Sequence, residues 1–295
     1  MTPYLFKLVF RLIAALPLRW LHSLGALLGR LDYLFSASHA SRTRENLIQS
    51  GVSVSAEQFS ALLRQSIDEA GKGMIELPWV WLRPAEEVLE HIVECQGWEL
   101  VEAAHARGKG LVILTPHIGC FEVIGLYVGA RMAMTCLYRV PKQAWMDDVI
   151  RRGRERGMMK LARADVGGVR VLLKALKRGE VIGILPDQVP GNGEGEWLPF
   201  FGRPAYTMTL VSRLLEASDA SVLMCFAERL PKGRGYSIKF SPLELQHGLP
   251  VTPQINHAVE MSVRSCPAQY LWSYNRYKVP AGVAPPEPHN KGESC

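Results

Sequence analysis

Short apolar runs alternate with segments of helical spacing, and this alternation is the feature that most constrains the fold. The run LVIL at 111–114 precedes an apolar helical segment at about 121–131, and the run VIGIL at 181–185 follows a helical segment at 169–178. Strands that alternate with helices of ten or more residues predict a parallel or mixed sheet with helices on its faces. We therefore predict an α/β fold with a mixed, largely parallel central sheet.

The stretch MTCLYR at 134–139 is a further predicted strand, between the runs at 111–114 and 181–185. A polar side chain lies at the end of each of these three strands or within three residues of it, in turn His117, Arg139 and Asp187. Ligands bind beyond the carboxyl ends of the strands in sheets of this kind. We therefore expect these three side chains to lie along one edge of the sheet, and we take that edge as the predicted site.

The N-terminal segment is rich in Leu, Phe and Trp but is interrupted by the basic residues Lys7, Arg11, Arg19 and Arg30. No uninterrupted apolar run approaches the roughly 18 to 20 residues that span a bilayer, and no signal-peptide cleavage site is evident. Pro17 separates two helical halves, and basic, Trp-bearing apolar helices are typical of a membrane interface. We predict that residues 1–35 form a membrane-associated helical anchor; an ordinary amphipathic helix packed on the domain is the alternative.

Basic residues cluster in one short stretch after the second predicted strand, namely Arg151, Arg152, Arg154, Arg156, Lys160 and Arg163. Within a chain of net charge +6, such a cluster favours an acidic protein partner, a phosphate-bearing ligand or an anionic membrane. A solvated helix face is the alternative interpretation.

The six cysteines stand singly, without a C-x-x-C pair. This spacing indicates neither a zinc site nor a disulfide framework, so we expect a reducing compartment and no metal site. Residues 36–278 are expected to form the main domain. The proline-rich, polar segment 279–295 is predicted to be a disordered tail.

The turn TPHIGCFE at 115–122 places a histidine, a cysteine and a glutamate after a buried strand. His117 and Glu122 are five residues apart, which on a regular helix separates them by about 140°. They can meet only if His117 lies in the loop and Glu122 in the first helical turn. A carboxylate on one imidazole nitrogen would leave the other nitrogen free to accept a proton, as a general base does.

Two other interpretations of this turn remain open. His117 could be a loop histidine bonded to a neighbour, with Glu122 favoured by the positive end of the helix dipole. Alternatively, Cys120 could be a nucleophile with His117 as its base, although a cysteine in an apolar turn more often packs as a small hydrophobic residue.

The segment His117-Ile-Gly-Cys-Phe-Glu122 resembles the H-x-x-x-x-E motif of the bacterial lipid A biosynthesis acyltransferases, the lauroyl and myristoyl transferases. These enzymes are related to the glycerolipid acyltransferases, which carry H-x-x-x-x-D. The resemblance covers nearly the whole chain except the C-terminal tail. Further blocks resemble the family in the same order: LGALLGRL at 24–31, RTRENL at 42–47, LYR at 137–139, VRVLLKALKRGEVIGILPDQ at 169–188, LPFFG at 198–202 and QYLWSYNRYK at 269–278.

The resemblance implies transfer of a fatty acyl group to a hydroxyl of a lipid A precursor or a similar lipid at the cytoplasmic face of the bacterial inner membrane. It implies an acyl carrier protein thioester as donor, with acyl-CoA as the alternative. Neither a cofactor nor a covalent enzyme intermediate is expected, and no nucleic acid partner is expected. The remaining alternatives are a Cys120-dependent thioesterase or hydrolase and a non-catalytic lipid-binding membrane protein.

The resemblance also implies roles for particular residues. His117 would deprotonate the acceptor hydroxyl, and Glu122 would orient and charge the imidazole. Arg139 is assigned to anion or oxyanion stabilisation and Asp187 to organisation of the site. Arg170 is assigned to the lipid phosphate or the carrier protein.

Overall fold

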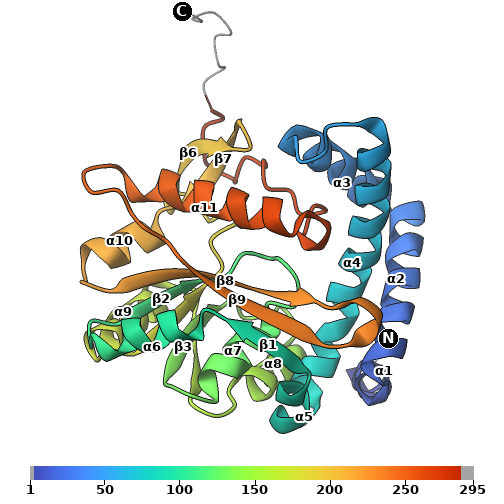
Figure 1. Ribbon diagram of the computed structural model, residues 1–295, viewed down its shortest axis with the longest axis horizontal. Helices are drawn as coiled ribbons and strands as arrows, with labels where there is room; N and C mark the ends of the chain where they lie inside the picture. Colours follow the sequence, from blue (N-terminus) through green and yellow to red (C-terminus); the bar gives the residue numbers. More distant parts are fainter. Residues whose placement is uncertain (1–2, 287–295) are drawn as a thin grey trace, which may run out of the picture.

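The computed structural model describes residues 3–286 of the chain, and a seven-stranded sheet forms its centre (Figure 1). In spatial order the strands are β1 (Ile92–Gln96), β9 (Tyr236–Pro242), β8 (Ser221–Arg229), β2 (Leu111–Leu114), β5 (Val181–Ile184), β3 (Met134–Tyr138) and β4 (Met159–Arg163). Neighbouring strands are parallel except for the antiparallel pair β8 and β9. The predicted α/β fold with a mixed, largely parallel sheet is confirmed.

Helices cover both faces of this sheet and close one end of the molecule (Figure 1). A β-hairpin of β6 (Gly195–Phe200) and β7 (Arg203–Met208) lies apart from the main sheet. The helices are α1 (Pro3–Ala15), α2 (Leu18–Phe35), α3 (Ala37–Ser50), α4 (Ala56–Leu82), α5 (Ala85–Glu90), α6 (Trp98–Ala106), α7 (Glu122–Gly129), α8 (Ala144–Arg154), α9 (Val166–Lys177), α10 (Leu210–Glu216) and α11 (Val251–Ser265).

The central strand β2 divides the buried side chains into two cores. Its four residues are fully buried, and successive side chains of a strand point to opposite faces. Leu111 and Ile113 pack in the core that contains residues of α2, α4, α6 and α7. Val112 and Leu114 pack in the core that contains residues of α9, α10 and α11. A strand buried on both faces explains why its sequence is continuously apolar rather than alternating.

One predicted helix is shorter than expected, because part of it is a strand. The helical spacing of residues 143–160 predicts one continuous helix there, but α8 ends at Arg154 and the chain enters β4 at Met159. Gly157, in the turn between α8 and β4, has a φ of +62°, which glycine adopts at little steric cost. The strand β4 lies at the sheet edge, where charged side chains such as Lys160 are favoured and hide the apolar pattern.

A second helix boundary was also misplaced. A threonine before an apolar segment is a common helix cap, so the sequence predicts that Thr207 begins a helix that reaches residue 215. Thr207 instead belongs to strand β7, and α10 begins after Thr209. The buried Thr207 side chain instead takes part in hydrogen bonds to Ala205 and Arg276.

The N-terminal segment forms the helix pair expected from Pro17, with α1 ending before the proline and α2 beginning after it. Large apolar side chains project outward from both helices, with Tyr4 80%, Trp20 69% and Phe35 80% exposed. None of the helices in residues 3–286 has the length and apolarity needed to cross a bilayer. The helices α1 and α2 thus present an exposed apolar surface. Part of the predicted tail, residues 287–295, lies outside the described residues.

The helix α2 packs closely on α4 through glycines. A side chain at Gly71 of α4 would place its Cβ 2.0 Å from the carbonyl oxygen of Gly25 and 2.5 Å from the amide nitrogen of Gly29. Small residues of this kind allow two helix backbones to approach within contact distance. The glycine face of α2 is consequently used for packing on the domain, and its opposite face carries the exposed apolar residues.

A buried carboxylate joins the N-terminal helices to the sheet. Glu76 of α4 accepts hydrogen bonds from Arg229 Nε of β8 at 2.6 Å and from the Tyr236 hydroxyl of β9 at 3.0 Å, and its other contact is His22 Nε2 of α2 at 2.6 Å. Burial alone would raise the pKa of Glu76, but Arg229 and His22 outweigh burial and lower that pKa to about 2. The stabilisation linked to this ionised carboxylate is present above its ordinary pKa of 4.5 and is lost as the pH falls toward 2.

Replacing Arg229 by methionine is expected to lower the free energy of unfolding by about 3–5 kcal/mol, because Glu76 would stay buried without its strongest counter-charge. Denaturant titration of the purified protein measures this difference. The matched control is Arg213→Met on the exposed surface of α10, which should change stability by no more than about 0.5 kcal/mol. Equal stability of the Arg229→Met protein and the wild type would contradict the role given to this ion pair.

Candidate functional site

The register between β2 and β5 brings the two main site residues together. Leu114 is paired with Ile184 in this parallel ladder, and His117 and Asp187 each lie three residues beyond those partners. Two chains that leave a parallel sheet at the same register emerge side by side. His117 and Asp187 therefore meet at the carboxyl edge of the sheet, although 70 residues separate them in sequence.

The carboxylate of Asp187 holds His117 by both its side chain and its main chain. Oδ1 lies 2.8 Å from the imidazole Nδ1, and Oδ2 accepts a hydrogen bond from the His117 amide at 2.9 Å. Burial by itself would raise the pKa of Asp187, but the charge and hydrogen bonds of His117 lower it below its ordinary value. Asp187 is therefore ionised at neutral pH and fixes the position of the imidazole.

The second imidazole nitrogen, Nε2, faces Gln188. The Gln188 side-chain amide nitrogen lies 3.0 Å from Nε2. An ionised carboxylate can only accept, so the ring hydrogen of the neutral imidazole lies on Nδ1, toward Asp187, and Nε2 is the nitrogen that can accept a hydrogen bond. The His117 side chain keeps 13% of its surface exposed, against 2% for Asp187. The ring is therefore held by a buried carboxylate and remains reachable from solvent.

The turn that carries His117 is fastened on both sides. The amides of Gly119 and Cys120 donate to the carbonyls of Gln269 and Ala227 at 3.0 and 2.8 Å, and Leu271 donates to the His117 carbonyl at 3.1 Å. Gly119 has a φ of +62°, and a Cβ at this position would lie 1.8 Å from the Ala227 carbonyl oxygen. Only glycine fits this position, which explains the glycine in the sequence HIGC.

Arg229 connects this turn to the buried Glu76. Its Nη2 donates to the Gly119 carbonyl at 2.7 Å, while its Nε donates to Glu76. A guanidinium carries several donors in a rigid plane, so one side chain can bind both acceptors at once. The position of the turn therefore depends on the same ion pair that joins α2, α4 and the sheet.

Glu122 has different partners from those expected. It was expected to approach the imidazole of His117, but its carboxylate accepts hydrogen bonds from Trp81 Nε1 at 2.9 Å and from Arg154 Nε at 2.9 Å, with a further contact to Arg154 Nη2. The carboxylate on the imidazole is Asp187 instead. The bend between loop and helix is present as predicted, but it directs Glu122 toward α4 and α8.

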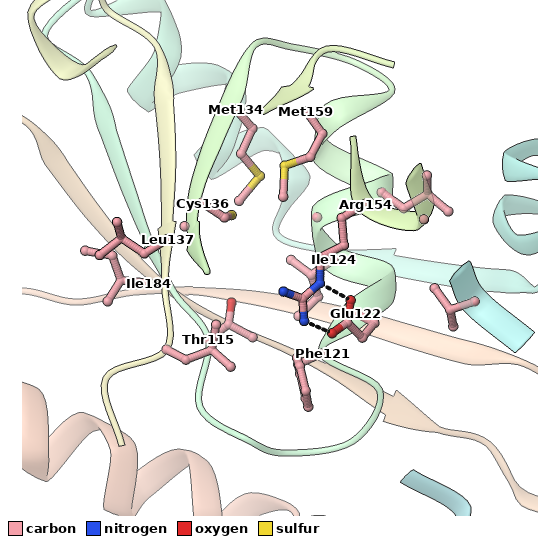
Figure 2. A pocket seen from close by; sticks show the side chains of 16 residues that line it. Thr115, Phe121, Glu122, Ile124, Met134, Cys136, Leu137, Arg154, Met159 and Ile184 are labelled. Atoms are coloured by element: carbon pink, nitrogen blue, oxygen red, sulfur yellow. Dashed lines mark hydrogen bonds and ion pairs between the residues drawn. The ribbon is translucent and has the colours of Figure 1, made fainter. Parts of the chain in front are cut away.

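A narrow apolar cavity of about 60 Å³ lies beside Glu122. Figure 2 shows Glu122 and Arg154 joined at its wall, with the sulfur atoms of Met134 and Met159 near each other on another side. Thr115, at the beginning of the turn that carries His117, also lines the cavity. The cavity thus connects the polar turn with the interior between α7 and the sheet.

The other arginines predicted for the site lie on the surface. Arg139 follows β3 at the expected edge but is exposed, and Arg170 is exposed on α9. The arginines that contact the site are Arg154 and Arg229. In the sequence, Arg154 stands out only as one member of a basic run. Arg229, the last residue of β8, carries no distinguishing signal there. Their partners, Glu122 and the Gly119 carbonyl, are set by tertiary packing.

Cys120 is buried, and its surroundings do not favour a nucleophilic thiolate. Its side chain is 3% exposed, and burial together with the nearby Glu76 charge raises the pKa of its thiol well above the ordinary value. A nucleophilic cysteine needs a lowered pKa and access to substrate. In residues 3–286 the structure also holds no group of three His, Cys, Asp or Glu side chains suited to a metal ion.

An α/β sheet that presents an oriented histidine at its carboxyl edge defines a site able to take a proton from a hydroxyl. Comparison with known proteins identifies the class. The family model for the bacterial lipid A biosynthesis acyltransferases matches residues 1–279. The chain belongs to this family of acyltransferases, which confirms the family inferred from the sequence blocks.

Individual relatives share about a quarter of their residues with this chain. The lipid A biosynthesis lauroyltransferase of Escherichia coli (strain K12) is 27% identical over 282 residues, which cover 93% of this chain and 91% of that protein. The palmitoleoyltransferase of the same strain is 27% identical over 274 residues, covering 89% and 86%. Its myristoyltransferase is 24% identical over 267 residues, covering 88% and 81%.

We expect the Cys120 thiol to react with iodoacetamide at pH 8 only as fast as the protein opens, because it is buried and protonated. Mass spectrometry of tryptic peptides from native and urea-unfolded protein measures the two alkylation rates. The urea sample is the control that the peptide is detectable. Alkylation of Cys120 at equal rates in the native and unfolded protein would contradict this prediction.

Proposed function

We propose that this protein transfers a fatty acyl group from an acyl carrier protein thioester to a hydroxyl of a lipid A precursor or a similar glycolipid. His117 acts as the general base. The observation that carries this proposal is the pair of contacts on its imidazole: the Asp187 carboxylate lies 2.8 Å from Nδ1, and the Gln188 side-chain amide lies 3.0 Å from Nε2. Nε2 takes the hydroxyl proton, and the resulting alkoxide attacks the thioester carbonyl directly.

Asp187 is proposed to supply the carboxylate function in this mechanism. It fixes the tautomer, and its charge stabilises the imidazolium that forms when Nε2 accepts a proton. Gln188 occupies Nε2 at 3.0 Å, so the acceptor hydroxyl would replace this amide as it binds. The collapse of the tetrahedral intermediate then expels the thiolate of the donor, which takes up the proton held by His117.

Glu122 remains a proposed catalytic-site residue, with Arg154 as its counter-charge. Both line the apolar cavity beside the catalytic turn. The cavity walls include Met134 and Met159 (Figure 2), and methionine side chains are flexible enough to move aside for a ligand. We assign this cavity to the acyl chain and the Glu122–Arg154 pair to its polar wall, beside the thioester.

The exposed apolar surface on α1 and α2 is proposed to lie in the membrane interface. Trp20 is 69% exposed and Leu34 72% exposed, while basic residues such as Arg11 and Arg19 occur on the same two helices. Apolar side chains among acyl chains with arginines at the phosphates are the pattern of an interfacial helix. This placement would hold the enzyme at the inner membrane, on its cytoplasmic face, beside an insoluble acceptor.

The distribution of charge supports a carrier protein as the donor. Residues 151–178 contain ten basic and two acidic residues, a net charge of +8, whereas the whole chain carries +6. The rest of the chain therefore has a net charge of −2. Acyl carrier proteins are acidic, and a concentrated positive surface steers such a partner to its docking site.

Part of this positive charge lies along one face of α9. Val166, Arg170, Lys174 and Lys177 follow one another at spacings of four, four and three residues, which place them within about 80° of the helix circumference. We call this set the α9 stripe; its four members are exposed, and Val166 is 70% exposed. Figure 1 shows α9 at the opposite end of the molecule from α1 and α2. The stripe is thus accessible to a soluble protein while α1 and α2 contact a membrane.

Alanine at His117 is expected to lower kcat for acyl transfer from acyl carrier protein to a lipid A precursor by about a hundredfold to ten-thousandfold, through loss of the general base. Asp187→Asn should cost about a hundredfold or more, because the neutral amide no longer selects the tautomer. Glu122→Gln should cost about tenfold to a hundredfold, because Arg154 loses its counter-charge. A radiolabelled acyl donor and product chromatography measure these rates.

The control for these variants is Cys120→Ala, which should retain activity. Loss of all turnover in Cys120→Ala with full activity in His117→Ala would contradict the mechanism and favour a cysteine hydrolase. Binding of lipid and carrier protein with no His117-dependent product would instead favour a non-catalytic lipid-binding protein.

Charge reversal in the α9 stripe is expected to affect only the carrier-bound donor. Lys174→Glu should raise KM for acyl carrier protein thioester about threefold to tenfold at low salt, and the effect should shrink at high ionic strength. KM for the same acyl group on N-acetylcysteamine should not change. Initial rates with both donors measure this, with Arg213→Glu on α10 as the matched control. An equal rise for both donors, or none for either, would exclude α9 as the docking face.

A further inference from the structure

An open groove of about 480 Å³ lies between α3 and the C-terminal segment 271–278. Its size is within the range of small-molecule binding sites. No residue that lines it was predicted to be functional. Its polar lining comes from two separate parts of the sequence: His39, Arg42, Ser273, Tyr274, Asn275 and Lys278.

The lining of the groove is suited to an anion. Arg42 is half-buried, and among residues 3–286 no carboxylate forms an ion pair with it. Lys278 is exposed, with Nζ 5.5 Å from the centre of the Tyr274 ring. Of the residues that line the groove, His39 has an acidic neighbour, because Asp32 Oδ2 lies 2.9 Å from His39 Nδ1. Two cations therefore remain for a ligand, together with the Ser273 hydroxyl and the Asn275 amide.

The wall of the groove is tied directly to the catalytic turn. Leu271, which also lines the groove, donates its amide to the His117 carbonyl at 3.1 Å. The Tyr274 hydroxyl accepts a hydrogen bond from the Val189 amide at 2.9 Å, two residues after Asp187. Two hydrogen bonds therefore couple the wall of the groove to the loops that carry His117 and Asp187.

Asn46 explains how two distant sequence blocks build one site. Its side-chain amide donates to the carbonyls of Trp272 at 2.7 Å and Tyr274 at 3.1 Å. These contacts fasten α3, which carries Arg42 one turn earlier, to the segment that carries Lys278. The blocks RTRENL and QYLWSYNRYK, at opposite ends of the chain, thus meet as the two sides of the groove.

The surroundings of the groove favour an amphiphile over a free anion. Immediately before α3, at the end of α2, Leu34 and Phe35 are 72% and 80% exposed. They belong to the apolar surface assigned above to the membrane interface. A cationic, hydrogen-bonding groove next to exposed apolar side chains matches a molecule with an anionic sugar headgroup and acyl chains.

We propose that this groove binds the phosphorylated sugar headgroup of the acceptor lipid, with Arg42 and Lys278 as its phosphate ligands. This inference rests on the proposed acyl transfer to a glycolipid and adds the part of the protein that holds the acceptor. Arg170 had been assigned to the lipid phosphate or the carrier protein. The geometry favours Arg42 as the phosphate ligand, because Arg42 lines the groove, whereas Arg170 belongs to the α9 stripe.

The test is steady-state kinetics of Arg42→Gln and Lys278→Gln with a phosphorylated lipid A precursor and with the same lipid after phosphatase treatment. Each variant should raise KM for the phosphorylated acceptor about tenfold to a hundredfold, as expected for loss of a charge-assisted hydrogen bond. KM for the donor should not change, and the difference between variant and wild type should disappear with the dephosphorylated lipid. Arg44→Gln is the matched control, because Arg44 is also on α3 but lies over the Phe59 ring.

Several outcomes would overturn the inference. An unchanged KM in both variants, or an equal rise with phosphorylated and dephosphorylated acceptor, would show that the groove does not bind the phosphate. Inorganic phosphate is the second probe. If it competes with the acceptor at micromolar concentration in wild type but not in Arg42→Gln, and the Arg42→Gln change leaves acceptor KM intact, the groove is a free-phosphate site.

A binding experiment separates failure of this inference from failure of the proposed function. Two inactive proteins, His117→Ala and His117→Ala/Arg42→Gln, are incubated with mixed micelles that contain the phosphorylated precursor. The amount of bound lipid is then measured in the absence of turnover. Arg42-dependent binding supports the groove even if the wild type transfers no acyl group. Binding that is equal in the two proteins overturns the groove while the transfer reaction stands. Circular dichroism of both proteins confirms that they are folded.

Discussion

The buried ion pair of Glu76 and Arg229 is the interaction on which the other parts of this structure depend. It lies where α2, α4 and strands β8 and β9 meet, and the same guanidinium binds the carbonyl of Gly119 in the turn that carries His117. A buried carboxylate without a partner is strongly unfavourable, so the four elements are held in one arrangement. The N-terminal helices are therefore an integral part of the domain, and their packing is coupled to the position of His117.

The sheet contributes the second constraint, which is register. Because β2 and β5 are parallel neighbours with Leu114 opposite Ile184, the residues that follow each strand emerge together. His117 meets Asp187 for this reason, and a shift of one residue would turn the side chains of one strand to the other face. The site is thus positioned by main-chain pairing and is then fastened by the C-terminal segment around Gln269 and Leu271.

Under the proposed function two dissimilar substrates must reach one histidine, and the surfaces around the site would keep their approaches apart. The apolar surface of α1 and α2 and the groove beside Arg42 lie on the side that would face the acceptor lipid, whereas the α9 stripe lies at the opposite end (Figure 1). A water-soluble donor and a membrane-bound acceptor can then approach without sharing a surface. The narrow cavity beside Glu122 lies between α7 and the sheet, where an acyl chain would be shielded from water.

The sequence by itself determined the fold class, the position of the turn at His117 and the family, because apolar periodicity, a glycine-containing turn and ordered sequence blocks are local features. Tertiary structure decided which side chains meet. Glu122, five residues from His117, turned to Trp81 and Arg154, whereas Asp187 reached the imidazole from 70 residues away. The sequence did not predict strand β4, because edge strands carry charged residues that hide the apolar pattern. Arg42 and Lys278 line one groove only because α3 packs beside the C-terminal segment. Pairings of this kind depend on strand register and long-range packing, which no local pattern encodes.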